Sequence, residues 1–156
     1  MRKIKFRGKR IDNGEWIYGN LIKNINEDTD EVRFFIIRNP RLTKDCGCCD
    51  SCECDYNCVG YIIEIKEETV GELTGLKDCI GKEIYEGDMI KISDSDMEYF
   101  PEDGEDFIVK WFKDCCGFWI WHIESNRWWD GDMNPFSYEP EIEIIGNIYE
   151  NPELIK

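Results

Sequence analysis

The order of hydrophobic and polar residues predicts that the chain begins with a β-hairpin. Apolar and polar side chains alternate over residues 3–7, and the return segment 15–22 carries Trp16 and Tyr18 on one face. Asn13-Gly14 lies between the two segments. This pair is typical of a type I′ hairpin turn, in which both central residues have positive φ. If the Trp16 ring is buried, we expect Trp16→Ala to cost roughly 3–5 kcal/mol.

The rest of the chain has the pattern of further short strands. They are bounded by glycine, proline or polar runs, and no segment has twelve residues of helical periodicity. The expected strands are 32–38, 61–66, 70–73, 89–92, 107–112, 117–121 and 141–149. Residues 124–140 are expected to be a loop, and Pro152 is expected to end the last strand, with one helical turn in the tail.

The segment 81–92 is the part of the chain where turn residues and strand pattern agree best. A turn at Gly81 leads through a short bridging segment to a second turn at Gly87-Asp88, and a strand follows. Later strands can close against this one. Short strands at this spacing predict a mainly β protein with little helix, folded as a small barrel or a rolled antiparallel sheet.

Length and composition are those of a compact protein without a membrane segment. The chain has 156 residues, of which 42% are hydrophobic, enough for one domain or two small halves with a shared core. We expect one domain, with a hairpin region at 1–76, a barrel-forming half at 77–156 and an insertion at 41–60. No run approaches the roughly 20 apolar residues of a membrane helix. The N-terminus has no apolar signal core, so we expect a cytoplasmic protein.

Charge is distributed unevenly along the chain. The net charge is −15, which opposes direct binding to nucleic acid because phosphates are bound mainly by Lys and Arg. Residues 1–23 have a balance of +5, which leaves −20 for the rest. We expect the basic segment to pair with acidic groups within the chain or in a second subunit, and we expect a homo-oligomer. The acidic segment 93–106 does not have the spacing of a calcium loop and is expected to be solvated.

Cysteine is the most unusual feature of the composition. The chain has nine, and six of them lie between Cys46 and Cys58. The C-x-x-C spacings within this cluster can chelate zinc. Reversible disulfides and a thiol-bearing loop without metal are the alternatives. For zinc, the preferred ligands are Cys46, Cys49, Cys54 and Cys58.

Other reactive side chains do not form a recognisable catalytic motif. His122 is the only histidine, and no motif pairs it with a serine or cysteine, so we expect a structural or surface role. Cys115 and Cys116 could join a metal site only if the fold brings them to the insertion, and Cys79 is expected to be a lone turn thiol. We therefore expect no enzymatic activity. An enzyme based on the cysteine cluster would need a cleft that brings a thiol close to His122 or to carboxylates.

An aromatic-rich region follows residue 110. Its tryptophans are Trp111, Trp119, Trp121, Trp128 and Trp129. Core packing explains most of them. Adjacent residues in extended chain point in opposite directions. One ring of the Trp128-Trp129 pair is therefore a candidate for an exposed interface anchor.

Three stretches of the chain together resemble the YopX-like family of phage and prophage proteins. They are 1–8 with 16–19, 69–88, and 144–154, which includes Gly146-Asn147-Ile148-Tyr149. The resemblance implies a small SH3-like β-barrel encoded by a temperate phage or a related mobile element. It implies no catalytic residues. The cysteine cluster and Cys79 depart from the family pattern.

These observations lead to one main functional hypothesis and two alternatives. The main one is a non-enzymatic interaction module in the cytoplasm of a bacterial host, acting as a homo-oligomer or on a host or phage protein. That assignment draws on the barrel fold, which by itself does not determine function. The alternatives are an acidic DNA mimic that inhibits a host nucleic-acid enzyme and a zinc-binding module.

The zinc hypothesis predicts the metal content of the purified protein. Chain purified without oxygen is expected to carry at least one equivalent of zinc, because thiolates at chelating spacing bind this ion tightly. Elemental analysis measures it. Replacing Cys49 and Cys58 by serine should remove the metal, whereas Cys79→Ser should not. Less than one equivalent per wild-type chain would count against the hypothesis.

Overall fold

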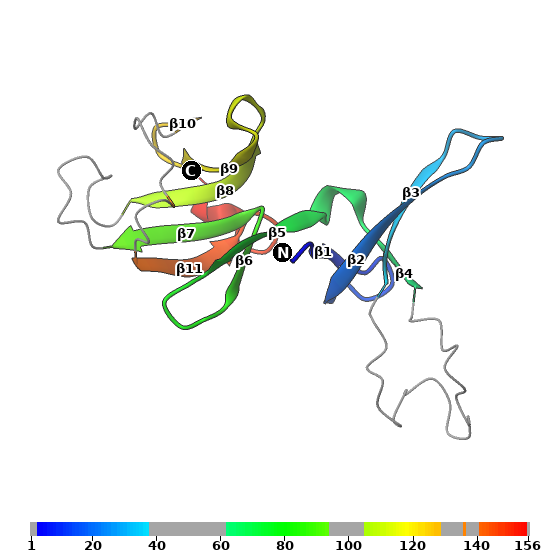
Figure 1. The fold of residues 1–156 in the computed structure, drawn as a ribbon, viewed down its shortest axis with the longest axis horizontal. Helices are drawn as coiled ribbons and strands as arrows, with labels where there is room; N and C mark the ends of the chain where they lie inside the picture. Colours follow the sequence, from blue (N-terminus) through cyan, green and yellow to red (C-terminus); the bar gives the residue numbers. More distant parts are fainter. Residues whose placement is uncertain (1–2, 38–61, 94–104, 129–135, 137–140, 156) are drawn as a thin grey trace, which may run out of the picture. The chain divides into compact units, whose positions relative to one another are not determined.

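The computed structural model describes residues 3–37, 62–93, 105–128, 136 and 141–155. Within them the chain is mainly β, with three short 3-10 helices and no α-helix. Two compact units are present, one formed by Ile4–Glu72 and the other by Met1–Lys3 with Leu73–Lys156 (Figure 1). The prediction of a mainly β chain is confirmed.

The N-terminal unit is built from four antiparallel strands in chain order. They are β1 (Phe6–Lys9), β2 (Trp16–Ile25), β3 (Val32–Ile37) and β4 (Ile62–Ile65). Each pairs with the next. A 3-10 helix, η1 (Glu67–Thr69), follows β4.

This small sheet curls so that its last strand returns to its first. The backbone N–H of Lys66 donates to the carbonyl of Lys9 at 2.8 Å. Ile65 forms an isolated antiparallel bridge with Arg10. These contacts cover part of the outer edge of β4, where unpaired backbone groups would otherwise face solvent.

The inner face of the curled sheet holds the core of the N-terminal unit. Ile17, Ile36 and Ile65 are buried there, one from each of three strands. Gly19 lies on the same face, and a Cβ at this position would stand 2.1 Å from the carbonyl oxygen of Ile37. Only glycine permits this close approach of two backbones.

The first hairpin turn differs from the predicted type I′ turn. The strands separate after the Lys9–Trp16 pair, and the backbone N–H of Arg10 donates to the carbonyl of Glu15 at 3.0 Å. Gly14 has φ of 73°, but Asn13 is not among the residues with positive φ. Asn13 instead accepts a hydrogen bond from Glu15 N–H through its side chain. The turn is therefore a four-residue loop, a length also common in hairpins.

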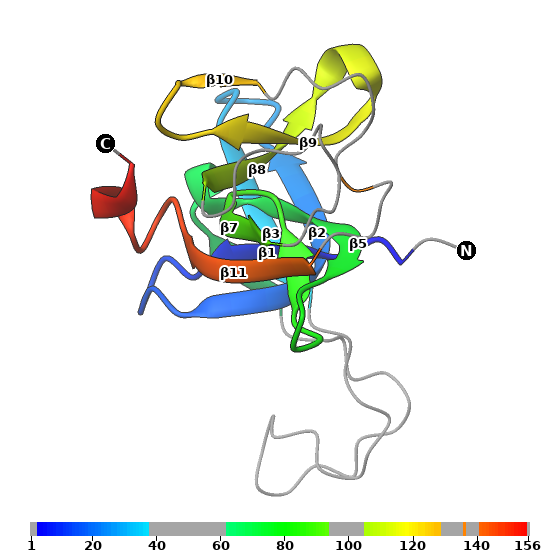
Figure 2. The ribbon, with the colours of Figure 1, turned by 90° about the vertical axis from the view of Figure 1, so that its left-hand side faces the viewer.

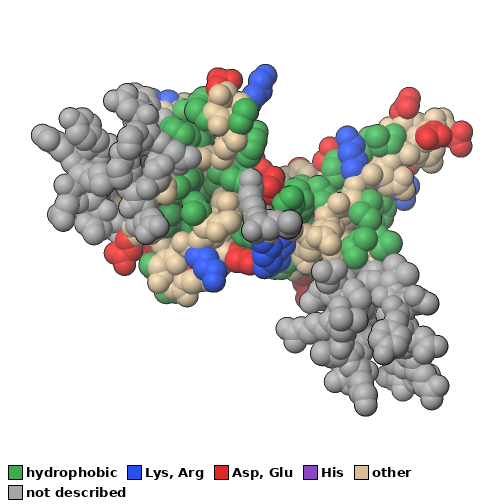
Figure 3. Space-filling view, in the orientation of Figure 1, with side chains coloured by type: hydrophobic (Ala, Val, Ile, Leu, Met, Phe, Trp, Pro, Cys, Tyr) green, Lys and Arg blue, Asp and Glu red, His purple; other side chains and the backbone are tan. Residues whose placement is uncertain are grey.

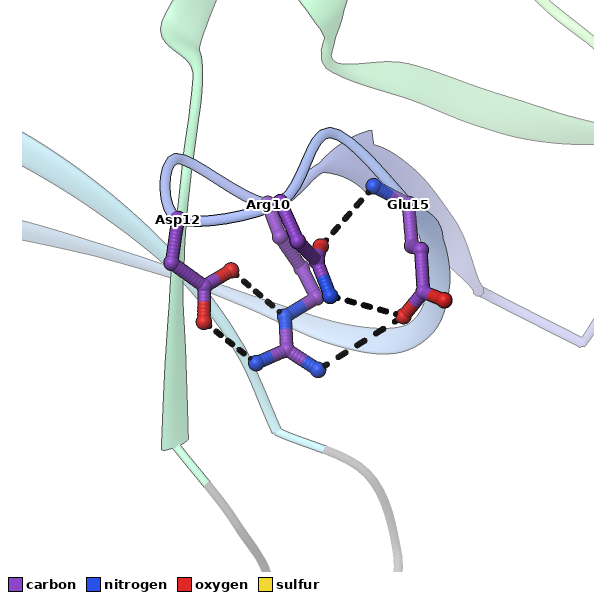
Figure 4. A network of polar contacts seen from close by, with 4 residues as sticks. Arg10, Asp12 and Glu15 are labelled. Atoms are coloured by element: carbon purple, nitrogen blue, oxygen red, sulfur yellow. Dashed lines mark hydrogen bonds and ion pairs between the residues drawn. The ribbon is translucent and has the colours of Figure 1, made fainter.

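An ion pair lies across this turn. The guanidinium of Arg10 donates two hydrogen bonds to Asp12, at 2.8 and 2.5 Å (Figure 4). The bonds from Arg10 lower the pKa of the Asp12 carboxyl. Both groups are open to solvent, where such pairs contribute little to stability.

The C-terminal unit contains most of the remaining strands. β5 (Gly71–Lys77) begins in the N-terminal unit, where Gly71 and Glu72 pair with β1, and then pairs with β6 (Glu83–Tyr85). A five-stranded antiparallel sheet has the order β10-β9-β8-β7-β11 (Figures 1 and 2). Its strands are β7 (Asp88–Ser93), β8 (Asp106–Phe112), β9 (Gly117–His122), β10 (Arg127–Trp128) and β11 (Glu141–Asn147).

The turn between β6 and β7 agrees with the prediction for 81–92. The buried Asp88 carboxylate accepts the backbone N–H of Tyr85 at 2.8 Å. Gly87, with φ of 84°, donates its N–H to Val109 and accepts the N–H of Ile148. The turn therefore holds β6, β7, β8 and the segment after β11 together.

The five-stranded sheet is apolar on both faces. One face carries a cluster centred on the fully buried Phe107, Ile90 and Ile120. The other carries Met89 and Ile108. Phe107 and Ile108 are adjacent in β8 and therefore point to opposite faces of the sheet, and both are buried. Neither face of the sheet is left to solvent at this point.

Two predictions about the architecture need correction. The segment 124–140 is not entirely loop, because β10 lies in it and pairs with β9. The described strands form two antiparallel sheets that do not close into a barrel, and the SH3-like barrel is not confirmed. In the N-terminal unit a single bridge, rather than a continuous ladder, joins β1 to β4. In the five-stranded sheet β10 and β11 are opposite edges.

The close approach at Gly19 predicts a large effect of one added methyl group. We expect Gly19→Ala to destabilise the protein by about 1–3 kcal/mol, because the new Cβ must displace the backbone of β3. Urea unfolding measures the change. Gly117→Ala is the control, since its Cβ would lie at an ordinary 3.7 Å from the carbonyl oxygen of Cys115. Equal effects of the two substitutions would contradict this account.

Candidate functional site

The face of the N-terminal sheet that points away from its core is rich in cations and aromatic rings. Arg7 pairs with Tyr18, and Lys9 pairs with Trp16, so these side chains share one face. Lys5 precedes Arg7 by two residues and therefore belongs to the same face. The face arises from a simple pattern, because β1 alternates cationic residues with Phe6 and Gly8, which belong to the inner face.

The cations of β1 lie over the rings of β2. The guanidinium carbon of Arg7 is 4.8 Å from the centre of the Trp16 ring, and Lys9 Nζ is 5.3 Å from the same ring. Lys5 Nζ lies 5.2 Å from the centre of the Tyr18 ring. These distances fall within the roughly 6 Å range of cation–π attraction. The attraction fixes the positions of both the cations and the rings.

The same face continues across β3 and β4 as an apolar surface. Tyr18, Ile22 and Ile62 are 42%, 37% and 53% exposed. Ile22 pairs with Phe35, and Ile62 pairs with Ile37, and both partners are half-buried. Figure 3 shows hydrophobic side chains at the surface of this unit. Apolar side chains of β2, β3 and β4 therefore lie opposite one another on this face.

We call this surface the outer face. It consists of Lys5, Lys9, Trp16, Tyr18, Ile22, Phe35, Ile37 and Ile62, together with Arg7, which is buried at 5% exposure. Aromatic residues are enriched in protein interfaces, and exposed isoleucines beside them add apolar area. The chemistry of the outer face is that of a binding surface.

The predicted metal ligands cannot be placed. Cys46, Cys49, Cys54 and Cys58 lie outside the described residues, as does most of the acidic segment. Within the described ranges, no three His, Cys, Asp or Glu side chains are grouped so that they could hold a metal ion. The three described cysteines, Cys79, Cys115 and Cys116, are free thiols exposed to solvent.

His122 has two partners that the sequence did not reveal. Its Nε2 lies 3.1 Å from a carboxylate oxygen of Glu105. Its Nδ1 lies 2.8 Å from both the backbone N and the Oγ of Ser125. A backbone N–H can only donate, so Nδ1 is the acceptor and the ring proton sits on Nε2, facing Glu105. Glu105 lies close because Phe107 pairs with His122 across β8 and β9.

This arrangement contains the residue types of a catalytic triad but not its geometry. A triad histidine needs a free lone pair to take the proton of the serine hydroxyl. Here the backbone N–H of Ser125 already occupies the lone pair of Nδ1. His122 instead ties the turn after β9 to the residue before β8. This agrees with the predicted structural role.

The tryptophans after residue 110 pack mainly on one another. Phe112 stacks on Trp128 with ring centres 4.5 Å apart, and Trp121 meets Trp128 edge-on at 5.1 Å. Lys110 Nζ lies 4.3 Å over Trp121, and burial lowers the pKa of this lysine. Trp128 is half-buried in this cluster, while Trp129 lies outside the described residues. Trp128 is therefore not an exposed anchor, and Trp111, at 43%, is the more exposed ring.

The family model described as YopX protein matches residues 5–156. The chain belongs to the YopX protein family. A comparison with curated proteins finds no match. Among solved structures, protein EF1440 from Enterococcus faecalis is similar over all of both chains, with 21% identity and a TM-score of 0.50. At this identity the likeness concerns the fold alone. No helix in the described ranges is long and apolar enough to span a membrane.

The stretches that resemble the YopX family hold turns in place. After β11, Asn147 Oδ1 accepts the backbone N–H groups of Tyr149 and Glu150 at 3.0 and 3.1 Å. Asn151 Oδ1 in turn accepts the N–H of Asn147 at 3.2 Å, and a Cβ on Gly146 would stand 2.5 Å from that oxygen. The turn before β7 is built in a similar way. These stretches therefore specify turns of the fold, while the first of them, 1–8 with 16–19, also contains Lys5, Arg7, Trp16 and Tyr18 of the outer face.

The role of His122 predicts different effects of two neighbouring substitutions. His122→Ala should destabilise the protein by about 0.5–1.5 kcal/mol, because the hydrogen bond from the exposed N–H of Ser125 is lost. Ser125→Ala keeps that N–H and should change stability by less than about 0.5 kcal/mol. Thermal and urea unfolding measure both. Labelling of Ser125 by a fluorophosphonate, a reagent for activated serines, would contradict the structural role.

Proposed function

We propose that this YopX protein is a non-enzymatic interaction module, encoded by a phage or prophage and acting in the cytoplasm of a bacterial host. It binds a protein partner through the outer face. The observation that supports the proposal is the exposed apolar surface of Tyr18, Ile22 and Ile62 on the side of the sheet opposite its core.

The composition of the outer face favours a protein over other partners. Three exposed apolar side chains on β2 and β4, the strands on either side of β3, gain free energy when another apolar surface covers them, about 25 cal/mol for each Å² removed from water. Trp16 and Tyr18 are rigid rings held under cations, so little conformational entropy is lost when they are covered. A net charge of −15 works against a nucleic acid in this role.

Charge favours a second copy of the chain as the partner. The cations of the outer face lie in the segment 1–23, with its balance of +5, whereas the rest of the chain sums to −20. An acidic surface of one subunit therefore complements the basic rim of the outer face of another. This is the homo-oligomer expected from the sequence.

The experiment compares the mass in solution of wild-type protein with that of two variants. Tyr18→Ser with Ile62→Ser removes apolar area from the outer face. Ile80→Ser is the control, because Ile80 is 84% exposed at a turn of the other unit. We expect wild type and control to form the same oligomer and the double variant to dissociate at least about tenfold more readily, as measured by light scattering over a dilution series.

Two outcomes would each refute a different part of the proposal. A double variant that assembles like wild type would refute the role of the outer face. A monomeric wild type would refute the second copy as partner. In that case, capture from host lysate tests whether the outer face binds a different protein. The proposal then requires a host protein that wild type and control retain and that the double variant loses.

The two alternative functions depend on other parts of the chain. The DNA mimic concerns the acidic segment, and the zinc-binding module concerns the cysteine cluster. Both segments lie largely outside the described residues, so these alternatives stay predictions.

A further inference from the structure

Two adjacent thiols lie in the turn between β8 and β9. Phe112 pairs with Gly117, so only four residues connect the strands. The 3-10 helix η2 (Lys113–Cys115) fills the turn, and Cys116 ends it in the left-handed region with φ of 49°. The N–H of Cys116 donates to the carbonyl of Lys113 at 3.2 Å. This hydrogen bond closes the turn at Cys116.

Both thiols are available for chemistry. Cys115 and Cys116 are exposed and neither is in a disulfide. The Cys116 thiol lies 3.5 Å from the carbonyl oxygen of Lys113, to which it can donate only a weak hydrogen bond. The turn presents two soft ligands on adjacent residues at the surface.

Geometry disfavours a disulfide between these neighbours. Adjacent Cα atoms are about 3.8 Å apart across a trans peptide. Unstrained disulfides need about 4.4–6.8 Å between Cα atoms, and their sulfurs come within about 2.05 Å of each other. Bonds from a thiolate to a bound ion are about 2.3 Å each, so an ion between two sulfurs lets them stay much farther apart. A bridging ion therefore fits this pair better than an S–S bond does.

The surroundings indicate which kind of ion fits. Structural zinc sites use four protein ligands. Within the described ranges, no third His, Cys, Asp or Glu joins the pair to form such a group. An ion satisfied by two protein sulfurs is required, and thiolate ligands select soft ions.

We propose that Cys115 and Cys116 form a chelating site for a soft ion that two thiolates satisfy, with trivalent arsenic as the chemical class of ligand. With phenylarsine oxide as the reagent, the arsenic–oxygen bond breaks and two arsenic–sulfur bonds form. The two thiol protons leave with the oxygen as water. Arsenic stays trivalent, so the step needs no oxidant or reductant.

The test uses the full chain with the six cysteines between 46 and 58 replaced by serine, which removes competing thiols. The protein is reduced with a phosphine and mixed with one equivalent of phenylarsine oxide and excess glutathione. Trypsin then releases the peptide 114–127, which contains Cys115 and Cys116 and no other cysteine. Mass spectrometry should find one phenylarsenic group on this peptide.

Single substitutions separate chelation from independent thiol reactivity. Cys115→Ser and Cys116→Ser should each weaken retention of the reagent against glutathione by about 10²-fold, because the second bond is then no longer intramolecular. Cys79→Ser should leave retention unchanged. Retention by both single variants, absence of the adduct from the peptide, or its appearance there as an internal disulfide would each overturn the proposal. Unfolding curves of the variants verify that all are folded.

Discussion

The backbone of one residue, Gly87, connects the strands of the C-terminal unit. Its N–H donates to Val109 in β8, and its carbonyl accepts from Ile148 after β11. The next residue, Asp88, is buried and accepts the N–H of Tyr85. A side chain at Gly87 would meet Tyr149 at 3.2 Å and would have to adopt φ of 84°. The five-stranded sheet and the two apolar clusters on its faces therefore depend on a glycine at this turn.

The parts of the fold that could be predicted from the sequence are those that local chemistry determines. Short apolar runs bounded by turn or polar residues located β3, β4, β8 and β9 closely, and glycine marked the turn before β7. The first hairpin turn was predicted wrongly because Asn13 bonds to Glu15 through its side chain, which its identity alone does not show. β10 was missed because two residues are too short to form a pattern, and the strand exists only through pairing with Trp121 and His122.

The site was harder to predict than the fold for the same reason. The basic character of the first strand was evident, but the stacking of Arg7 on Trp16 depends on the register of the hairpin. A period-two pattern of Lys5, Arg7 and Lys9 beside Trp16 and Tyr18 was the available signal. Glu105 and His122 are far apart in the chain, and only strand pairing brings them together. Features that arise from register therefore escape a reading based on local pattern.

The pairing of Ile37 with Ile62 has a consequence for how this chain can vary. These residues end β3 and begin β4, and they lie opposite each other in the ladder, so the two ends of the intervening segment are fixed about 5 Å apart. The free-energy cost of closing a loop rises only slowly with its length, by about 0.6 kcal/mol for each doubling. The sheet can therefore accept segments of very different length and origin between these two isoleucines, including an epitope or a fluorescent label, without a change in its own register. During evolution, the same junction allows new chemistry to be added to the protein while its scaffold is kept.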